Sequence, residues 1–197
     1  MKKNAAVFLD RDGTINEEVG YLSRIEQLKL FPATFEAIRI INESGMKAVV
    51  VTNQSGVARG LFDEDFIDTV HNLINEMLRE KDAFIDRFYY CPHHPTEGND
   101  HYLQSCNCRK PKPGMLIKAS EELDIDLSRS YMVGDAAKDI ELVESVGAKG
   151  ILVKTGYGKK VISSDLPVPA RQTGIKPSYI AEDILDAINW IMRDRGK

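Results

Sequence analysis

Residues 5–14 read Ala5-Ala6-Val7-Phe8-Leu9-Asp10-Arg11-Asp12-Gly13-Thr14, an apolar run that ends abruptly at two aspartates. A second run of the same kind, Ala48-Val49-Val50-Val51, ends at Thr52. Short, uninterrupted apolar runs are typical of strands that are buried on both faces of a parallel sheet. Both runs therefore predict strands of such a sheet, with polar side chains directly after them.

The rest of the chain alternates short apolar runs with amphipathic helical patterns, which indicates βαβ units. Strands are expected at 5–9, 46–51, 87–90, 130–133, 150–153 and, as the weakest, 178–181. Helices are expected at 35–42, 66–78, 115–123, 140–146 and 184–192, with Asp63 as N-cap of the second. The sequence therefore predicts an α/β fold with a doubly wound parallel sheet, and a surface loop over 156–177.

The length and composition of the chain exclude several kinds of protein. With 197 residues, of which 43% are hydrophobic, the chain suits one domain spanning 1–197. Lys and Arg number 26 against 30 Asp and Glu, and the net charge of -4 argues against a nucleic-acid-binding protein. No apolar run approaches the roughly 18 residues that span a membrane, and no signal-peptide pattern is present. We therefore expect a cytoplasmic protein, a monomer, that acts on a small molecule and binds neither nucleic acid nor membranes.

Polar residues follow several of the expected strands. Asp10–Thr14 comes after the first, Thr52–Gly56 after the second, and Gly134-Asp135 after the fourth, while the basic segment Arg109–Pro113 precedes a helix. Ligands of open parallel sheets bind at the carboxyl ends of the strands, so these segments are expected to converge on one edge. Each one alone is also explained by the need for polar residues in loops, but their recurrence at the strand ends favours a site.

Taken together, these segments resemble the four motifs of the haloacid dehalogenase (HAD) superfamily of phosphohydrolases, over about residues 7–155. A finer resemblance, to sugar-bisphosphate phosphatases of this superfamily, is carried by residues 8–16, 20–21, 51–60, 90–95, 106–111 and 131–135. The superfamily pattern implies the doubly wound fold predicted above. The spacers 14–46 and 56–90 each hold one helix and little more, so no large cap domain is expected.

The resemblance implies a Mg²⁺-dependent phosphatase with Asp10 as nucleophile and Asp12 as general acid and then base. Thr52 and Lys110 would hold the transferred phosphoryl group. Mg²⁺ would be bound by the carboxylates of Asp10 and Asp135 and by the backbone carbonyl of Asp12. Asp139 is a further candidate near the metal, although an acid in the first turn of a helix also has a purely structural explanation.

Three cysteines and three histidines lie within one stretch of 18 residues: Cys91, His93, His94, His101, Cys106 and Cys108. Clustered thiols and imidazoles in a reducing compartment indicate a metal before a disulfide, and zinc takes four such ligands in structural sites. The spacing leaves both His93 and His94 open, and the resemblance selects His93. We expect a structural zinc loop over about 91–108, with three small buried thiols as the alternative.

Without a cap, the pocket walls are expected from the zinc loop and from residues 18–21. The candidate substrate-binding residues are Glu18, Val19, Gly20, Tyr21, Asn53, Gln54, Ser55, Arg59 and Arg109. The two arginines are candidates for a second phosphate, because a guanidinium group matches phosphate geometry.

Other functions remain open at this level. Histidinol-phosphate phosphatases are similar in their catalytic motifs and zinc loop. A phospho-acceptor receiver module also uses an aspartate, a threonine and a lysine on a parallel sheet, and a non-enzymatic zinc-loop adaptor would need none of these. Turnover separates the phosphatases from the other two.

Overall fold

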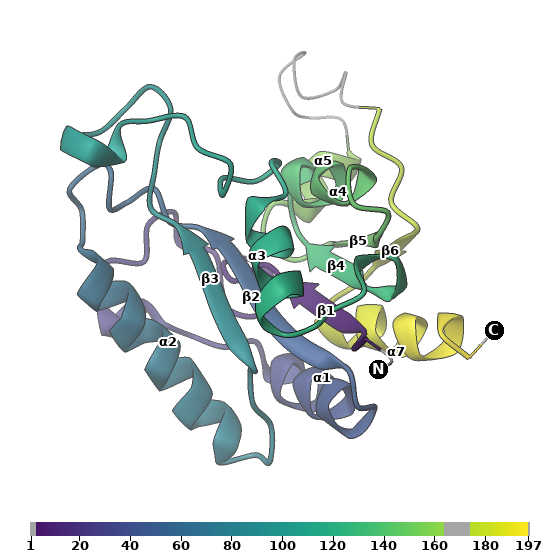
Figure 1. Ribbon diagram of the computed structural model, residues 1–197. Coiled ribbons are helices and arrows are strands. Elements are labelled where there is room, and N and C mark those ends of the chain that lie inside the picture. The colour runs from purple at the N-terminus through teal and green to yellow at the C-terminus, as the bar shows by residue number, and fades with distance from the viewer. Residues whose placement is uncertain (1–2, 164–173, 197) are drawn as a thin grey trace.

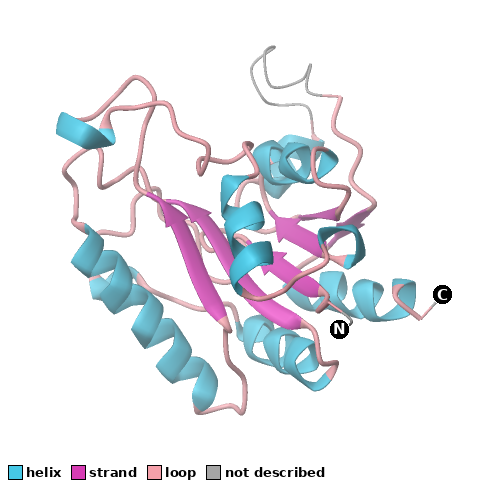
Figure 2. Cartoon of the chain, viewed as in Figure 1, coloured by secondary structure: helices cyan, strands magenta, loops and turns pink. Residues whose placement is uncertain are grey.

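The computed structural model describes residues 3–163 and 174–196. Its centre is a six-stranded sheet with strand order β3-β2-β1-β4-β5-β6, in which every neighbouring pair is parallel (Figures 1 and 2). The strands are β1 (Ala6–Leu9), β2 (Lys47–Asn53), β3 (Arg87–Cys91), β4 (Tyr131–Gly134), β5 (Lys149–Val153) and β6 (Tyr179–Ala181). All six expected strands are therefore confirmed.

Helices cover both faces of the sheet, as a doubly wound fold requires. They are α1 (Pro32–Glu43), α2 (Glu64–Arg79), α3 (Gly114–Glu122), α4 (Ala137–Glu144), α5 (Gly158–Ile162) and α7 (Ile184–Asp194). Side chains of α1, α2 and α7 pack with Val7 and Leu9 of β1, while α3 and α4 pack with Ala6 and Phe8. The alternation of side chains along a strand thus supplies two hydrophobic cores from one apolar run.

Two elements differ from the expectation. Strand β2 continues to Asn53, because Thr52 and Asn53 still pair with Tyr90 and Cys91 of β3. The loop expected over 156–177 is wrong for Gly158–Ile162, which forms α5, and its residues 164–173 lie outside the described part. The expected N-cap is confirmed, since the Asp63 side chain accepts a hydrogen bond from the amide of Phe66.

The connections leave the carboxyl edge of the sheet open. Between β1 and β2 lie only a 3-10 helix (Ile25–Gln27) and α1, and between β2 and β3 lies α2, so no large cap is present in the described residues. The long segment between β3 and α3 lies over the carboxyl ends of β2 and β3 (Figure 1). None of the helices described combines the length and the apolar character that crossing a membrane requires.

Candidate active site

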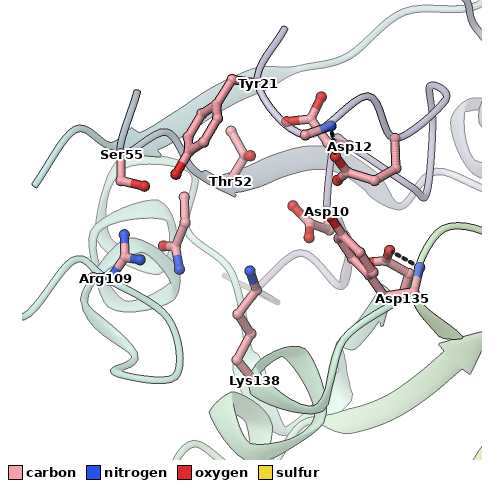
Figure 3. Close-up of a pocket in the computed structure, with 12 residues that line it drawn as sticks. Asp10, Asp12, Tyr21, Thr52, Ser55, Arg109, Asp135 and Lys138 are labelled. Atoms are coloured by element: carbon pink, nitrogen blue, oxygen red, sulfur yellow. Dashed lines mark hydrogen bonds between the residues drawn. The ribbon is translucent and has the colours of Figure 1, made fainter. Parts of the chain in front are cut away.

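The strand ends converge on one open, mostly polar pocket (Figure 3). Its lining residues are Asp10, Asp12, Glu18, Gly20, Tyr21, Thr52, Asn53, Ser55, Arg109, Asp135, Lys138 and Tyr157. The expected convergence of the segments after β1, β2 and β4 is thereby observed, and the segment 18–21 and the loop that carries Arg109 form walls.

Lys110 is buried beneath this pocket between two carboxylates. Its ammonium group lies 2.9 Å from Asp10 and 2.7 Å from Asp139. Burial alone would lower the pKa of Lys110, but the charges of Asp10 and Asp139 outweigh that effect and raise it. The Asn53 side chain donates to the Lys110 carbonyl (3.1 Å) and accepts from its amide (3.0 Å), which ties the lysine to the end of β2. A fixed positive charge therefore lies beside Asp10.

Three buried carboxylates form a cluster that suits a divalent cation. Oxygen atoms of Asp10, Asp135 and Asp139 lie within 4.8 Å of one another. Burial and the negative charges of Asp10 and Asp139 raise the pKa of Asp135 to about 8. Lys110 offsets only part of the repulsion among these three negative charges. Mg²⁺ is a hard cation that favours carboxylate oxygens, so it would offset the rest. The Asp139 carboxylate also accepts a hydrogen bond from the amide of Ala136 (3.1 Å) at the start of α4. Asp139 therefore both caps the helix and belongs to the carboxylate cluster.

Asp12 is held by three neighbours. The Arg11 guanidinium donates to both carboxylate oxygens (3.1 and 2.8 Å), and Asn16 and Gln54 donate at 2.9 and 2.8 Å. Burial alone would raise the pKa of Asp12, but the charge and hydrogen bonds of Arg11, together with the hydrogen bonds from Asn16 and Gln54, outweigh it and lower the pKa. Gln54 also donates to the Thr52 hydroxyl (2.9 Å), so it supports two candidate catalytic side chains.

Three of the expected substrate-binding residues lie outside the pocket lining. These are Val19, Gln54 and Arg59. Arg59 forms an ion pair with Glu97 and lies over the Tyr21 ring, 5.7 Å from its centroid. It thus connects a pocket wall to the loop after β3. The backbone of that wall is held by a short hydrogen bond from the Gly20 amide to Glu18.

The expected metal loop brings four ligand atoms together. The sulfur of Cys108 lies 3.2 Å from that of Cys91 and 3.1 Å from that of Cys106, and His93 Nδ1 lies 3.4 Å from Cys108. This cluster could hold a metal ion. His94 Nδ1 instead accepts backbone N–H groups of the following turn. His93, and not His94, therefore lies in this cluster.

Several heptose bisphosphate phosphatases are similar to the chain along most of its length. A model of HAD-hydrolase-like proteins matches residues 107–187. D-glycero-D-manno-heptose-1,7-bisphosphate 7-phosphatase of Thermosynechococcus vestitus is 42% identical over 190 residues, which cover 94% of both chains. D-glycero-beta-D-manno-heptose-1,7-bisphosphate 7-phosphatase of Haemophilus influenzae is 41% identical, over 93% of this chain and 94% of that protein. The chain belongs to the heptose bisphosphate phosphatase family of HAD-like hydrolases.

A solved structure of a heptose bisphosphate phosphatase is also similar to this chain. The D,D-heptose 1,7-bisphosphate phosphatase from B. bronchiseptica, complexed with magnesium and phosphate, matches with a TM-score of 0.83 at 29% identity, over 96% of this chain and 99% of that one. As a heptose bisphosphate phosphatase family member, the chain is a phosphoric monoester hydrolase.

Two residues that line the pocket were not expected from the sequence. They are Lys138 and Tyr157. A signal existed for Lys138, because a cation in the first turn of a helix opposes the helix dipole and needs another reason to be there. Tyr157 follows β5, outside the four motifs, and only the folded sheet brings it to the pocket.

Proposed function

We propose that the chain removes the 7-phosphate of D-glycero-D-manno-heptose 1,7-bisphosphate and releases heptose 1-phosphate and inorganic phosphate. The observation that carries this is Asp10, which lies at the end of β1 in an open pocket, with Lys110 2.9 Å away and Thr52 in the pocket lining. A nucleophilic carboxylate beside a fixed cation is suited to phosphoryl transfer, in which positioning and charge stabilisation dominate.

The reaction has two steps on this chain's own side chains. Asp10 attacks phosphorus, the bond from phosphorus to the C7 oxygen breaks, and an aspartyl-phosphate forms. Asp12, which is ionised in the free protein, would take up a proton as the anionic substrate binds and give it to the departing oxygen; it would later take a proton from the water that hydrolyses the aspartyl-phosphate. Mg²⁺ bound by Asp10, Asp135 and the Asp12 carbonyl would supply neutralisation of the phosphate charge.

The pocket lining supports a substrate with two anionic groups. Lys110 is committed to Asp10 and Asp139, while Arg109 and Lys138 line the pocket itself. Arg109 donates one N–H to the His93 carbonyl (3.0 Å), which leaves other donors of its guanidinium group for a second phosphate. The open carboxyl edge of the sheet admits a sugar between the two phosphates.

Zinc is the metal proposed for Cys91, His93, Cys106 and Cys108, because three thiolates and one imidazole are a typical structural zinc set. Arg109 and Lys110 follow Cys108 directly, so the metal would hold both cations in place. The product, a heptose 1-phosphate, suits the synthesis of nucleotide-activated heptose for lipopolysaccharide or another glycan, by a monomer in the cytoplasm.

The test is phosphate release in the presence of Mg²⁺ from four substrates: the two anomers of heptose 1,7-bisphosphate, histidinol phosphate and a generic aryl phosphate. A large preference in kcat/KM for one heptose bisphosphate is expected. Preference for histidinol phosphate would keep the chemistry and replace the substrate. Stable phosphorylation of Asp10 without turnover would favour a receiver module.

A further inference from the structure

The segment between β5 and α5, residues 154–157, contacts the carboxylate cluster, although it belongs to none of the four motifs. The amide of Tyr157 donates to Oδ2 of Asp135 at 2.8 Å, a bond drawn as a dashed line beside Asp135 in Figure 3. The Thr155 hydroxyl donates to the Gly13 carbonyl at 2.6 Å. One short loop is thereby bonded both to Asp135 and to the turn that follows Asp12.

Asp135 Oδ2 lies in a slot whose walls are two glycines. Gly13 has a φ of +80° and Gly156 a φ of +51°, and a Cβ on either would lie 2.1 or 2.0 Å from that oxygen. The same Cβ on Gly156 would lie 2.7 Å from the Gly13 Cα. A real Cβ cannot approach an atom so closely, so any side chain at position 156 must displace the Asp135 carboxylate or the Gly13 turn.

This arrangement restricts which way Asp135 points. Its side chain is buried, and Oδ2 is bonded to the Tyr157 amide and enclosed by the two glycines, which fixes the plane of the carboxylate. Groups that hydrogen-bond to a metal ligand orient it and tune its affinity. The Asp12 carbonyl belongs to the peptide that precedes Gly13, so the Thr155 bond acts on a second proposed ligand.

We propose that Thr155 and Gly156 are positioning residues that set the affinity for Mg²⁺ by fixing Asp135 and the turn after Asp12. This inference rests on the Mg²⁺ site of the proposed function and not on the identity of the sugar. Thr155 and Gly156 would then act on the reaction through the metal ligands that they position, whereas Tyr157 of the same loop lines the pocket itself.

The variant Gly156→Ala tests the proposal, with Gly45→Ala as the matched control. Gly45 also has a positive φ, of +75°, but no atom lies within 4 Å of the position of its Cβ. Both variants therefore carry backbone strain, and only the first displaces Asp135. A second variant, Thr155→Val, removes one hydroxyl at nearly constant shape and serves if Gly156→Ala fails to fold.

The measurement is calorimetric titration of Mg²⁺ into zinc-loaded, Mg²⁺-free protein. For Gly156→Ala we expect a dissociation constant raised by about 10- to 100-fold, a smaller rise for Thr155→Val, and no change for Gly45→Ala. Zinc content should stay at the wild-type value, and kcat at saturating Mg²⁺ should recover to within about threefold of it.

An unchanged Mg²⁺ dissociation constant in both Gly156→Ala and Thr155→Val, or an equal loss in Gly45→Ala, would overturn the inference. The proposed function fails differently: wild-type protein that binds Mg²⁺ normally but shows no preference for a heptose bisphosphate would overturn the substrate and leave this inference intact.

Discussion

Lys110 and Asp139 form an ion pair of 2.7 Å in which neither side chain is exposed to solvent. Removing two charges from water is costly, so a buried pair is weak support for stability as a whole. Breaking it is a different matter, because the remaining charge stays buried without its partner. The pair also holds the ammonium group 2.9 Å from Asp10. Its role is therefore to keep a cation beside Asp10, the proposed nucleophile.

The substitution Asp139→Asn should lower both stability and turnover. Within the described part of the chain, Lys110 then has Asp10 as its one remaining carboxylate partner, and the free energy of unfolding should fall by about 3 kcal/mol. Urea denaturation measures this, with Glu43→Gln of the exposed Arg39–Glu43 pair as control, where less than about 0.5 kcal/mol is expected. Equal stability of the two variants would contradict the assigned role of the pair.

The substitution Asp10→Asn should abolish turnover while the fold persists. The amide has the shape of the carboxylate but is not a nucleophile, so kcat should fall by roughly 10⁴-fold or more. Phosphate release and the thermal unfolding midpoint are measured together, with Asp65→Asn in the first turn of α2 as control for the change of charge. Activity near that of the wild type would remove Asp10 from the mechanism.

The substitution Lys138→Gln should reduce the preference for a bisphosphate over a monophosphate. Lys138 lines the pocket, and the charge-assisted bond it would make to the second phosphate accounts for about tenfold in kcat/KM. Heptose 1,7-bisphosphate is compared with heptose 7-phosphate, and Lys118→Gln, an exposed lysine on α3, is the control. An equal loss on both substrates would place Lys138 at the transferred phosphate instead.

The parts that local pattern determines could be predicted from the sequence. The apolar runs of β1 and β2 predict buried strands, and parallel strands bring their ends to one edge, so the convergence of Asp10, Thr52 and Asp135 follows from topology. The clustering of the Cys91, Cys106 and Cys108 thiols is expected because all three lie in the same stretch, residues 91–108. These relations depend on strand order and spacing, and they do not depend on side-chain rotamers.

The remaining parts depend on which partner each side chain finds in the folded chain. Gln54 and Arg59 lie in the expected segment, yet one turns to Asp12 and the other to Glu97. Tyr157 reaches the pocket only because β5 lies beside β4. Spacing along one chain does not encode such choices between competing hydrogen-bond and ion-pair partners, so the sequence alone does not place these side chains.

Stability should decrease with acid in a way that depends on His71. This ring is buried, stacks on Phe88 and lies 3.5 Å from a nitrogen of Arg11. Burial, and then the charge of Arg11, lower the pKa of His71 from 6.5 to about 3. Below pH 6.5 the unfolded chain therefore binds a proton that the folded chain does not, which favours unfolding.

This imidazole should contribute a loss of up to about 1.4 kcal/mol per pH unit below its unfolded pKa. The variant His71→Phe retains the stacking and has no proton to bind, so its stability should fall less between about pH 7 and about pH 5. Urea denaturation at both pH values measures the difference, with exposed His101→Phe as control. Identical slopes for wild type and His71→Phe would exclude the effect.

Removal of zinc should lower activity through the loop and leave Asp10 in place. Cys108 directly precedes Arg109 and Lys110, and Arg109 donates to the carbonyl of His93, so the proposed zinc ligands would hold both cations. Without the metal, the loop loses its cross-links, and protease cleavage within residues 92–113 should accelerate. Activity should fall at least about tenfold and return on addition of Zn²⁺.

The variant Cys106→Ser should reproduce this loss, while His94→Gln, at a histidine outside the cluster, should retain zinc. Zinc-free protein with normal turnover and normal protease resistance would show that the loop holds its shape through protein contacts alone, and the structural role of the metal would then be wrong.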